Sequence, residues 1–441
     1  MDSISLPPKA ITAPGFRELV ATFTKIGFIS FGGAAGQIAM MHKIIVEEKK
    51  WLDEERYIHA LNYCTLLPGP EAQQLATYIG WLMHGARGGL AAGILFVVPG
   101  AVMMLGLSFL YALGSGLDVI DGLFFGIKAA VLAIVVHALL KIARRGLKSW
   151  PYYVVAGAAL SAILLLDLPF PLIIVSAAVI GALIAAQTAP VPRAMAADPA
   201  PPGRARRAFQ AAVACLIAWW APVALAALLL GSHHVLVDIG LFFSKLAVVT
   251  FGGAYAVLAY LAQAGVDKGW VDAREMIDGL GLAETTPGPT ILVNQFVAFL
   301  GAWRASAPLP PLAGAALGAL MASWVTFAPS FLWIFAGAPF VEDVRRNRHL
   351  AGALSGITAA VVGVIAFITL WFSLNVLFRE LGEGHAGVVR YFWVRLASLD
   401  LAAAALAVLA MLLMFVWHRG IMTTVGVVAV LGIIVRLLHL G

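Results

Sequence analysis

Apolar residues in this chain fall in long runs that charged residues rarely interrupt, for example 90–113, 123–140 and 401–416. Runs of about 18 or more apolar residues are typical of helices that span a membrane. We recognise about thirteen hydrophobic elements in all. Their approximate bounds are 16–46, 57–85, 89–113, 119–142, 150–166, 170–187, 209–230, 236–264, 276–303, 309–337, 350–376, 398–417 and 420–439. The pattern predicts an all-α polytopic membrane protein whose main partner is the lipid bilayer.

Composition agrees with this pattern. Of the 441 residues, 61% are hydrophobic and only 12% are charged. A soluble domain carries about 25% charged residues. A chain this apolar predicts that most of its helices lie in lipid.

The second half of the chain repeats the motifs of the first at a distance of about 220 residues. Each copy has a lysine in an apolar stretch, then a Phe-Gly-Gly (FGG) motif, a tryptophan, and a Pro-Gly-Pro (PGP) motif. The matched positions are Lys25 and Lys245, Phe31-Gly32-Gly33 and Phe251-Gly252-Gly253, Trp51 and Trp270, and Pro68-Gly69-Pro70 and Pro287-Gly288-Pro289. Farther along, Pro99 matches Pro329. We therefore expect two structurally similar halves.

The repeat divides the chain into three parts. We assign 1–187 to an N-terminal repeat, 188–235 to a linker plus one extra transmembrane helix, and 236–441 to a C-terminal repeat. The linker is rich in proline and alanine, which is typical of exposed connections. Seven hydrophobic elements separate the starts of the two repeats. If all seven span, the second repeat begins on the opposite side of the membrane, so the repeats are inverted.

Each element that contains an FGG or PGP motif is either a broken span or a re-entrant hairpin. Glycine and proline breaks free backbone polar groups, which a membrane tolerates only where protein or a water-filled cavity surrounds them. Legs of about 15 residues cover about 22 Å, which is enough to pass the midplane. The inversion survives if both such elements of a repeat re-enter, and it fails if only one does.

Positive charge in the loops predicts the orientation. If every element spans, one side holds Arg87, the 141–148 cluster, the linker arginines and Lys268. The side richer in lysine and arginine faces the cytoplasm. We therefore predict a cytoplasmic N-terminus and an external C-terminus. The net charge is +6 because lysine and arginine are frequent in the short loops. Since such residues set the orientation in the membrane, the charge does not predict nucleic-acid binding.

The paired breaks are the strongest pointers to a binding site. The residues after Pro70 and after Pro289 should start helices, because proline suits the first turn of a helix. Free N–H groups and the helix dipole make such an end a site for an anion. Gly33 and Gly253 allow a ligand to approach the backbone closely. Paired breaks in matching halves are typical of transporter substrate sites, although kinks for helix packing are the alternative.

Polar side chains near the breaks complete the predicted site. Lys25 and Lys245 are charges in apolar stretches, where charge is expensive and commonly functional; a snorkelling lysine is the alternative. Glu71 follows the first PGP motif, and its carboxylate either caps the helix or exchanges protons. Further candidates that hydrogen-bond an anion, or bond between helices, are Gln73, Gln74, Thr290, Asn294 and Gln295. Polar residues without a matching partner in the other repeat are His59, Lys128, His137, Asp278 and Glu284.

Enzyme and metal signatures are absent from the sequence. It has no GxSxG, HExxH or nucleotide-binding loop. Cys64 and Cys215 lie in apolar segments and predict neither a disulfide nor a metal site. We expect no cofactor and no enzyme activity; transport must then draw on a gradient or the membrane potential. The weakest rival is an enzyme acting on lipid-linked phosphates, with Glu71 beside His59 or His84 as its acid and base.

The motif set FGG, Trp-x-Asp and PGP, present twice in one chain, resembles the chromate ion transporter family in its long two-domain form. The stretch 67–78 is especially similar to that family. The resemblance covers nearly the whole chain and implies a bacterial inner-membrane protein that exports chromate and confers chromate resistance, with sulfate as a competitor. It implies that the FGG and PGP residues, Lys25 and Lys245 act in transport. Thr290 stands where the first repeat has Glu71, so we expect the halves to differ in role.

Alternative functions remain open at this stage. A transporter for sulfate or another oxyanion differs from a chromate exporter only in ligand and direction. A passive anion channel would use the same helix ends. The sequence also leaves the coupling ion and the oligomeric state open, a homodimer included.

Overall fold

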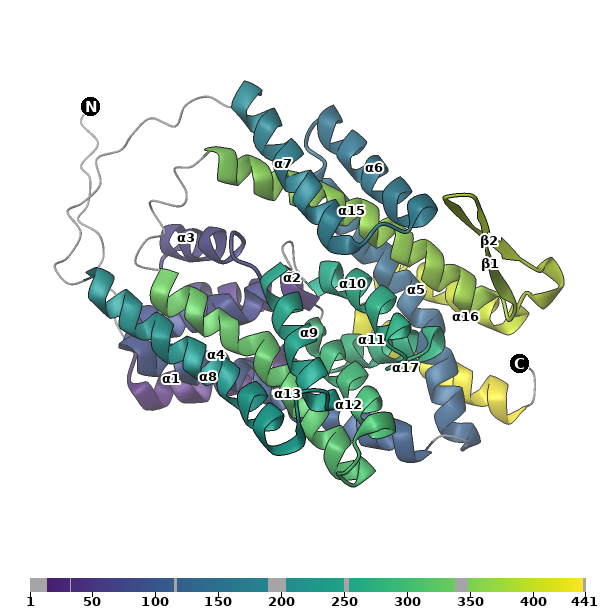
Figure 1. Ribbon diagram of the computed structural model, residues 1–441, viewed down its shortest axis with the longest axis horizontal. Helices are drawn as coiled ribbons and strands as arrows, with labels where there is room; N and C mark the ends of the chain where they lie inside the picture. The colour runs from purple at the N-terminus through teal and green to yellow at the C-terminus, as the bar shows by residue number, and fades with distance from the viewer. Residues whose placement is uncertain are drawn as a thin grey trace.

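The computed structural model describes residues 14–31, 33–114, 117–188, 204–249, 254–337 and 348–438. Over these residues the chain is mainly helical (Figure 1). Within the described ranges, five helices are long and apolar enough to cross a membrane. They are α4 (Glu71–Gly114), α5 (Asp118–Gly146), α8 (Arg204–Leu230), α13 (Pro311–Leu332) and α15 (Arg348–Leu377). The chain is therefore an α-helical polytopic membrane protein, as its hydrophobic pattern predicts.

The remaining elements of the N-terminal half are shorter. They are α1 (Phe16–Ile29), α2 (Gly33–His42), the π-helix η1 (Lys43–Glu48), α3 (Glu54–Cys64), α6 (Trp150–Leu166) and α7 (Phe170–Thr188). The C-terminal half adds α9 (Val235–Val249), α10 (Ala254–Asp267), α11 (Ala273–Thr285), η2 (Thr290–Leu292), α12 (Val293–Ala305), η3 (Trp333–Gly337), η5 (Leu396–Ser398), α16 (Leu401–Met411), η6 (Leu412–Val416) and α17 (Ile421–Leu437).

Helices end at the predicted glycine and proline breaks. The 14 residues of α1 and the 10 residues of α2 are separated at the first FGG motif. Neither reaches the roughly 30 Å of a hydrocarbon core at about 1.5 Å per residue. The first PGP motif separates α3 from α4, and the second separates α11 from η2. Gly32 and Phe251–Gly253 lie outside the described residues; α9 ends before the second FGG motif, and α10 begins after it.

The long helix α4 is two helices that fold back on each other. His84 and Gly85 have non-helical backbone angles, which divide it into 71–83 and 86–114. Gly80 packs against Gly88, and Gly93 packs against Thr77, so the two parts run antiparallel. The small residues allow this close backbone approach. The pair α12 and α13 packs in the same way, with Gly318 against Ala298 and Ala302.

Helices of the N-terminal half pack against helices of the C-terminal half. Helix α5 packs along α17, and α15 packs along α7 (Figure 1). In the first contact Gly126 lies against Val428, and in the second its repeat counterpart Gly356 lies against Ala177. Each repeat therefore places its long helix on the last helix of the other repeat.

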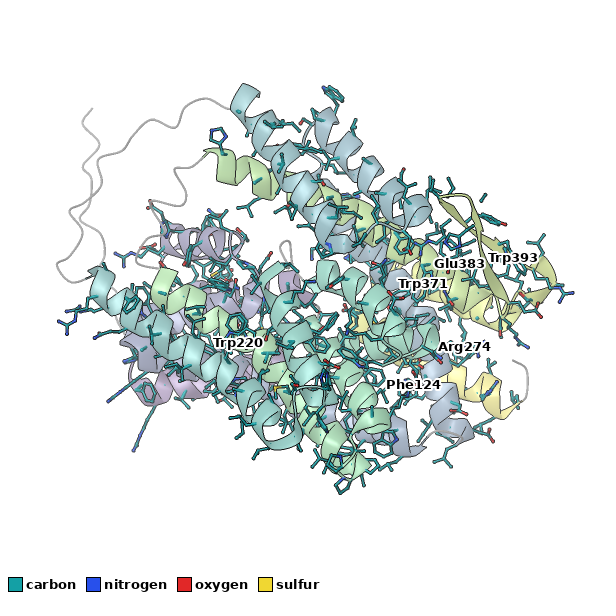
Figure 2. All side chains as sticks on the ribbon, viewed as in Figure 1. Phe124, Trp220, Arg274, Trp371, Glu383 and Trp393 are labelled. Atoms are coloured by element: carbon teal, nitrogen blue, oxygen red, sulfur yellow. The ribbon has the colours of Figure 1, made fainter. Side chains whose placement is uncertain are left out.

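A two-stranded antiparallel hairpin joins α15 to α16, in a stretch where the hydrophobic pattern predicts no element. Its strands are β1 (Leu381–Ala386) and β2 (Val389–Val394), and the register pairs Ala386 with Val389. Gly387 has a φ of +63° and allows the tight turn. The aromatic residues of β2 favour a strand; Figure 2 places Trp393 on this hairpin at the edge of the molecule.

Arg390 fastens the hairpin to the end of α6. Its guanidinium donates to the Ile163 carbonyl at 2.6 Å and pairs with the Asp167 carboxylate at 2.8 Å. The carbonyls at a helix end lack intrahelical partners, and a cation there also opposes the negative end of the helix dipole. The contact therefore holds the hairpin against the C-terminal end of α6.

Candidate functional site

The two PGP loops each contain a glycine in a conformation that other residues rarely adopt. The φ angles are +108° at Gly69 and +91° at Gly288. Both glycines are buried, as are Pro70, Pro287 and Pro289. The motifs are thus sharp interior turns rather than surface loops.

Each PGP loop contacts the other repeat. The Gly288 N–H donates to the Ser30 carbonyl at the end of α1, at 2.8 Å. Gly288 also packs on Gly100, where a Cβ would collide with the Pro287 carbonyl. On the other side, a Cβ at Gly69 would lie 3.8 Å from both the Ala247 carbonyl and the Ser330 hydroxyl.

These contacts are reciprocal in the repeat alignment. Ser330 follows Pro329, just as Gly100 follows Pro99, so the two positions correspond. Each loop therefore packs against the same region of the opposite repeat. The arrangement brings the first FGG segment next to the second PGP motif, although they are far apart in the sequence.

Buried amide side chains surround the loops. Gln37 on α2 donates to the Gly288 carbonyl at 2.5 Å and to the Ser30 carbonyl at 3.3 Å. Gln74 donates to the Pro68 carbonyl at 2.7 Å, and Asn294 donates to the Thr326 hydroxyl at 3.2 Å. The bonds of Gln37 and Gln74 hold the PGP loops in place, and the Asn294 bond joins α12 to α13. The oxygen of each of these amides has no hydrogen-bond partner among the described residues.

Several of these polar atoms have no hydrogen-bond partner among the described residues. Both amide atoms of Gln73 lack one, although its side chain is 0% exposed. One atom in each of five further side chains is also unpartnered; these side chains are Ser30, Gln37, Gln74, Asn294 and Ser330. A buried polar group without a partner costs about 1–3 kcal/mol, so such a concentration indicates a ligand-binding region.

Helix starts add backbone donors to the same region. Helix α4 begins at Glu71 directly after the first PGP motif, and η2 begins at Thr290 after the second. The amides of Ala72 and Gln73, and of Thr290 and Ile291, have no backbone partner among the described residues. Free amides at the positive end of a helix dipole are suited to an anion.

The two lysines do not lie in this buried region. Lys25 on α1 and Lys245 on α9 are both exposed on the outer faces of their helices. Lys245 Nζ lies 6.0 Å from the centre of the Tyr260 ring. Their attraction of an anion stays a prediction. Phe31 and Glu71 are half-buried at the edge of the region, and Gly33 begins α2 with a φ of +67°.

A second polar cluster lies between α5 and α11. Lys128 Nζ is 3.1 Å from Asp278 Oδ2, which also accepts a hydrogen bond from the Tyr111 hydroxyl at 2.9 Å. Asp278 Oδ1 has no partner among the described residues. Asp272 and Glu275 form a capping box at the start of α11, so Asp278 lies about 9 Å farther along the helix. In the repeat alignment Asp278 corresponds to His59, and Lys128 corresponds to Thr358. The second pair lacks the lysine and the aspartate, so the charge pair is not repeated.

Comparison with known proteins gives the family. A family model described as chromate transporter matches residues 17–186 and 237–435. This chain belongs to the chromate transporter family. Family members are transporters rather than enzymes, and the match covers both halves of the chain.

Two chromate transport proteins are similar to this chain over most of their length, and a third relative is similar over one half. A chromate transport protein of Pseudomonas aeruginosa is 30% identical over 376 residues, which are 82% of this chain and 82% of that protein. A chromate transport protein of Cupriavidus metallidurans is 28% identical over 361 residues, or 80% and 82%. An uncharacterized transporter of Bacillus subtilis is 25% identical over 169 residues, covering 38% of this chain and 95% of that protein. No solved structure matches the chain.

Three members of the buried polar region were missed in the sequence. Gln37 lies four residues after Gly33, where a single amide in an apolar stretch was the available signal. Ser30 and Ser330 carried no signal, because serine is common in membrane helices. Only their contacts with the PGP loops distinguish them.

Proposed function

We propose that this chromate transporter family member exports chromate across a bacterial inner membrane as a secondary transporter, driven by an ion gradient or the membrane potential. The observation that carries the proposal is the reciprocal pair of PGP loops. Each loop starts a helix with free amides inside the protein, next to unpartnered polar side chains. A tetrahedral dianion is recognised by several converging N–H donors. Sulfate has the same shape and charge and should compete.

We assign the binding of the oxyanion to the backbone after Pro70 and Pro289, with Gln73, Thr290 and Asn294 as side-chain donors. The FGG glycines would let the ion approach the backbone. Glu71 distinguishes the first helix start from the second, which has Thr290, and is proposed to make the two ends unequal. Lys25 and Lys245 would raise the local anion concentration from the outer faces of α1 and α9.

The repeats are proposed to be inverted. The reciprocal contacts of the PGP loops and of α5 and α15 support a two-fold relation between the halves. The end of α5 at Gly146 packs near Thr358, whereas the hairpin follows the end of α15 at Leu377. About 19 helical residues, or about 28 Å, separate these points. Corresponding connections therefore lie near opposite ends of a spanning helix, which supports inversion.

The division into two repeats of 1–187 and 236–441, with a linker and an extra helix at 188–235, is part of this proposal. The half-length transporter of Bacillus subtilis supports it, since a protein of one repeat's length exists. The loop charges support a cytoplasmic N-terminus. A homodimer stays open.

Flux into proteoliposomes tests the function. Purified protein is reconstituted, and chromate and sulfate uptake are measured with the membrane potential and the pH gradient set separately. Uphill chromate movement under one of these forces is the expected result. Downhill movement alone would indicate a passive channel, and sulfate movement without chromate would indicate a different oxyanion as the substrate.

A further inference from the structure

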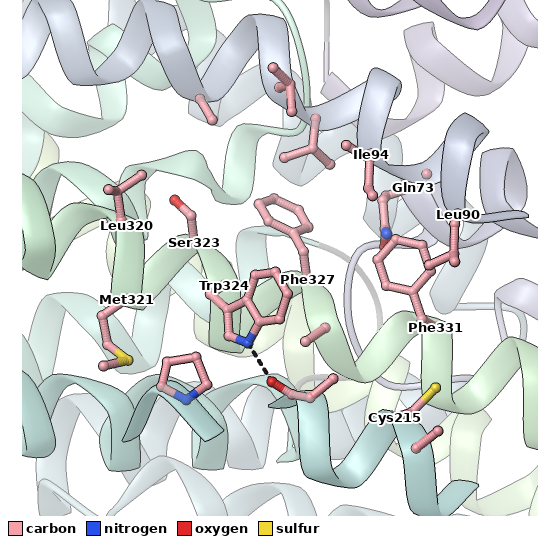
Figure 3. A pocket seen from close by; sticks show the side chains of 18 of the residues that line it. Gln73, Leu90, Ile94, Cys215, Leu320, Met321, Ser323, Trp324, Phe327 and Phe331 are labelled. Carbon is pink, nitrogen blue, oxygen red and sulfur yellow. Dashed lines mark hydrogen bonds between the residues drawn. The ribbon is translucent and has the colours of Figure 1, made fainter. Parts of the chain in front are cut away.

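A large apolar groove lies between α4, α8 and α13 (Figure 3). Its volume is about 1630 Å³. Helix α8 contributes one stripe of mostly small residues along nearly its whole length. The stripe is Arg207, Ala208, Ala211, Ala214, Cys215, Ala218, Pro222, Leu225, Ala226, Leu229 and Leu230.

The small side chains on α8 leave the groove open. Only 17% of the apolar window of α8 is buried in the protein, compared with 61% for α5. One hydrogen bond crosses the groove, from Trp324 Nε1 on α13 to the Ala218 carbonyl on α8, at 2.9 Å (Figure 3). Helix α8 thus packs on α9, α13 and η3 along part of its surface, and most of its apolar window is not covered by protein.

The lining is almost entirely apolar, with two polar side chains that lack partners among the described residues. Gln73 reaches the groove from the start of α4, and both of its amide atoms are unpartnered (Figure 3). Arg207 lies at the first turn of α8 and is exposed, without an ion pair in the described part of the chain. Ser323, by contrast, donates to Gln295 at 2.8 Å.

The length of the groove matches a membrane. From Arg207 to Leu230 the stripe covers about 35 Å of helix, slightly more than the roughly 30 Å hydrocarbon core. One end of the stripe therefore reaches the headgroup region. A cation at that end, above an apolar channel, complements a lipid with an anionic headgroup and a hydrocarbon tail.

We propose that this groove binds a phospholipid with an anionic headgroup, with its phosphate on Arg207 and an acyl chain along α8 between α4 and α13. The small residues of α8 provide the volume that the chain fills. An oxyanion does not suit the groove, because it would lose hydration without gaining donors along the apolar walls.

The lipid has a consequence for transport, and this part rests on the proposed function. Gln73 belongs both to the groove and to the start of α4, where we assign oxyanion binding. An acyl chain in the groove would contact that helix start and restrict its motion. Chromate flux should then depend on the lipid that occupies the groove.

Lipid retention tests the binding. Full-length protein is reconstituted into vesicles of phosphatidylcholine with phosphatidylglycerol, extracted in mild detergent, and analysed by native mass spectrometry. Wild type should retain phosphatidylglycerol in preference to phosphatidylcholine. Arg207→Gln should lower that preference about fivefold, since one basic residue near an anionic surface contributes about that factor. Arg206→Gln is the matched control, because Arg206 is exposed but does not line the groove, and it should retain wild-type preference.

Filling the groove gives a second test that does not depend on charge. Ala211→Phe and Ala214→Phe should each reduce retained lipid, whereas Val213→Phe on the outer face of α8 should not. Thermal unfolding identifies the variants that are folded, and either filling variant suffices. Equal lipid preference in both arginine variants, or full retention in a folded filling variant, would overturn the proposal. So would a spectrum of lipid-free dimers, which would assign the groove to a second copy.

Flux measurements distinguish a failure of the proposed transport function from a failure of the lipid proposal. If wild type moves no chromate, the proposed function fails, while lipid retention still decides the groove. If wild type moves chromate equally in vesicles with and without phosphatidylglycerol, the lipid binds without acting on transport, and the stated consequence is wrong.

Discussion

Two glutamines that follow the PGP motifs use their amides in opposite ways. Gln295 is satisfied at both ends, since it donates to the Ala101 carbonyl at 2.8 Å and accepts from the Ser323 hydroxyl at 2.8 Å. Gln73 is equally buried and has neither kind of partner among the described residues. At the scale of the residue, hydrogen-bond satisfaction distinguishes a structural amide from one that is available to a ligand.

Leucine substitutions should separate these roles. Gln295→Leu removes both bonds and takes the acceptor from the Ser323 hydroxyl, and should lower the free energy of unfolding by about 1–3 kcal/mol. Gln73→Leu removes an unpaired amide, so we expect no loss of stability but at least tenfold weaker chromate binding. Thermal unfolding and equilibrium chromate binding on the purified variants measure both quantities. Weaker binding in Gln295→Leu alone would contradict the assignment of Gln73.

The exposed lysines give a second test at this scale. Lys25→Gln and Lys245→Gln should each lower chromate uptake at low substrate concentration, because each removes a charge that attracts the anion. Lys25→Arg and Lys245→Arg keep the charge and should have milder effects. Initial uptake rates over a range of chromate and salt concentrations provide the measurement. Normal uptake by both glutamine variants would indicate lysines that only snorkel to the interface.

At the scale of the element, α5 and α11 are joined by a charge pair inside the protein. The pair of Lys128 and Asp278 connects the first repeat to the second, and Tyr111 adds a bond from α4. Charges at this depth are expensive and are stable only when paired. The pair therefore restricts how α11, the helix that leads to the second PGP motif, sits against α5.

Removing one partner should be worse than removing both. Lys128→Met leaves the Asp278 carboxylate buried without its cation and should cost about 3–5 kcal/mol of stability. The double variant Lys128→Met with Asp278→Leu should recover most of that loss, because no unpaired charge remains. A double-mutant cycle of thermal unfolding measures the coupling. Additive losses in the cycle would show that the two side chains act independently.

At the scale of the whole molecule, inversion predicts the sides on which two loops lie. The connection of α5 to α6 around Leu147 and the hairpin around Val388 correspond in the repeat alignment. Single cysteines at these positions, in a background without Cys64 and Cys215, should react with an impermeant thiol reagent from opposite sides of the membrane. The residue at 147 should react from the cytoplasm. Labelling of both from one side would contradict the inverted topology.

Much of the local structure followed from the sequence alone. The apolar runs predicted the membrane class, and the glycine and proline motifs predicted where α1, α3 and α11 end. These features depend on local chemistry, because the period of apolar residues and the conformational limits of glycine and proline act within a few residues. The hairpin after α15 was missed, since Arg390 is fixed by carbonyls of α6 far away in the sequence.

The sequence by itself determined that the chain is an α-helical membrane protein, that its halves repeat, and that the helices break at matched motifs. Only the tertiary structure decided that the first FGG segment contacts the second PGP motif, and that α4 folds back at Gly85. It also decided that Asp278 pairs with Lys128 and that a groove lies beside α8. The physical reason is that these features are contacts between helices of similar apolar composition. Lipid is as apolar as the helix surfaces, so small residues and a few buried polar groups select the partners, and their effect appears only when the helices meet.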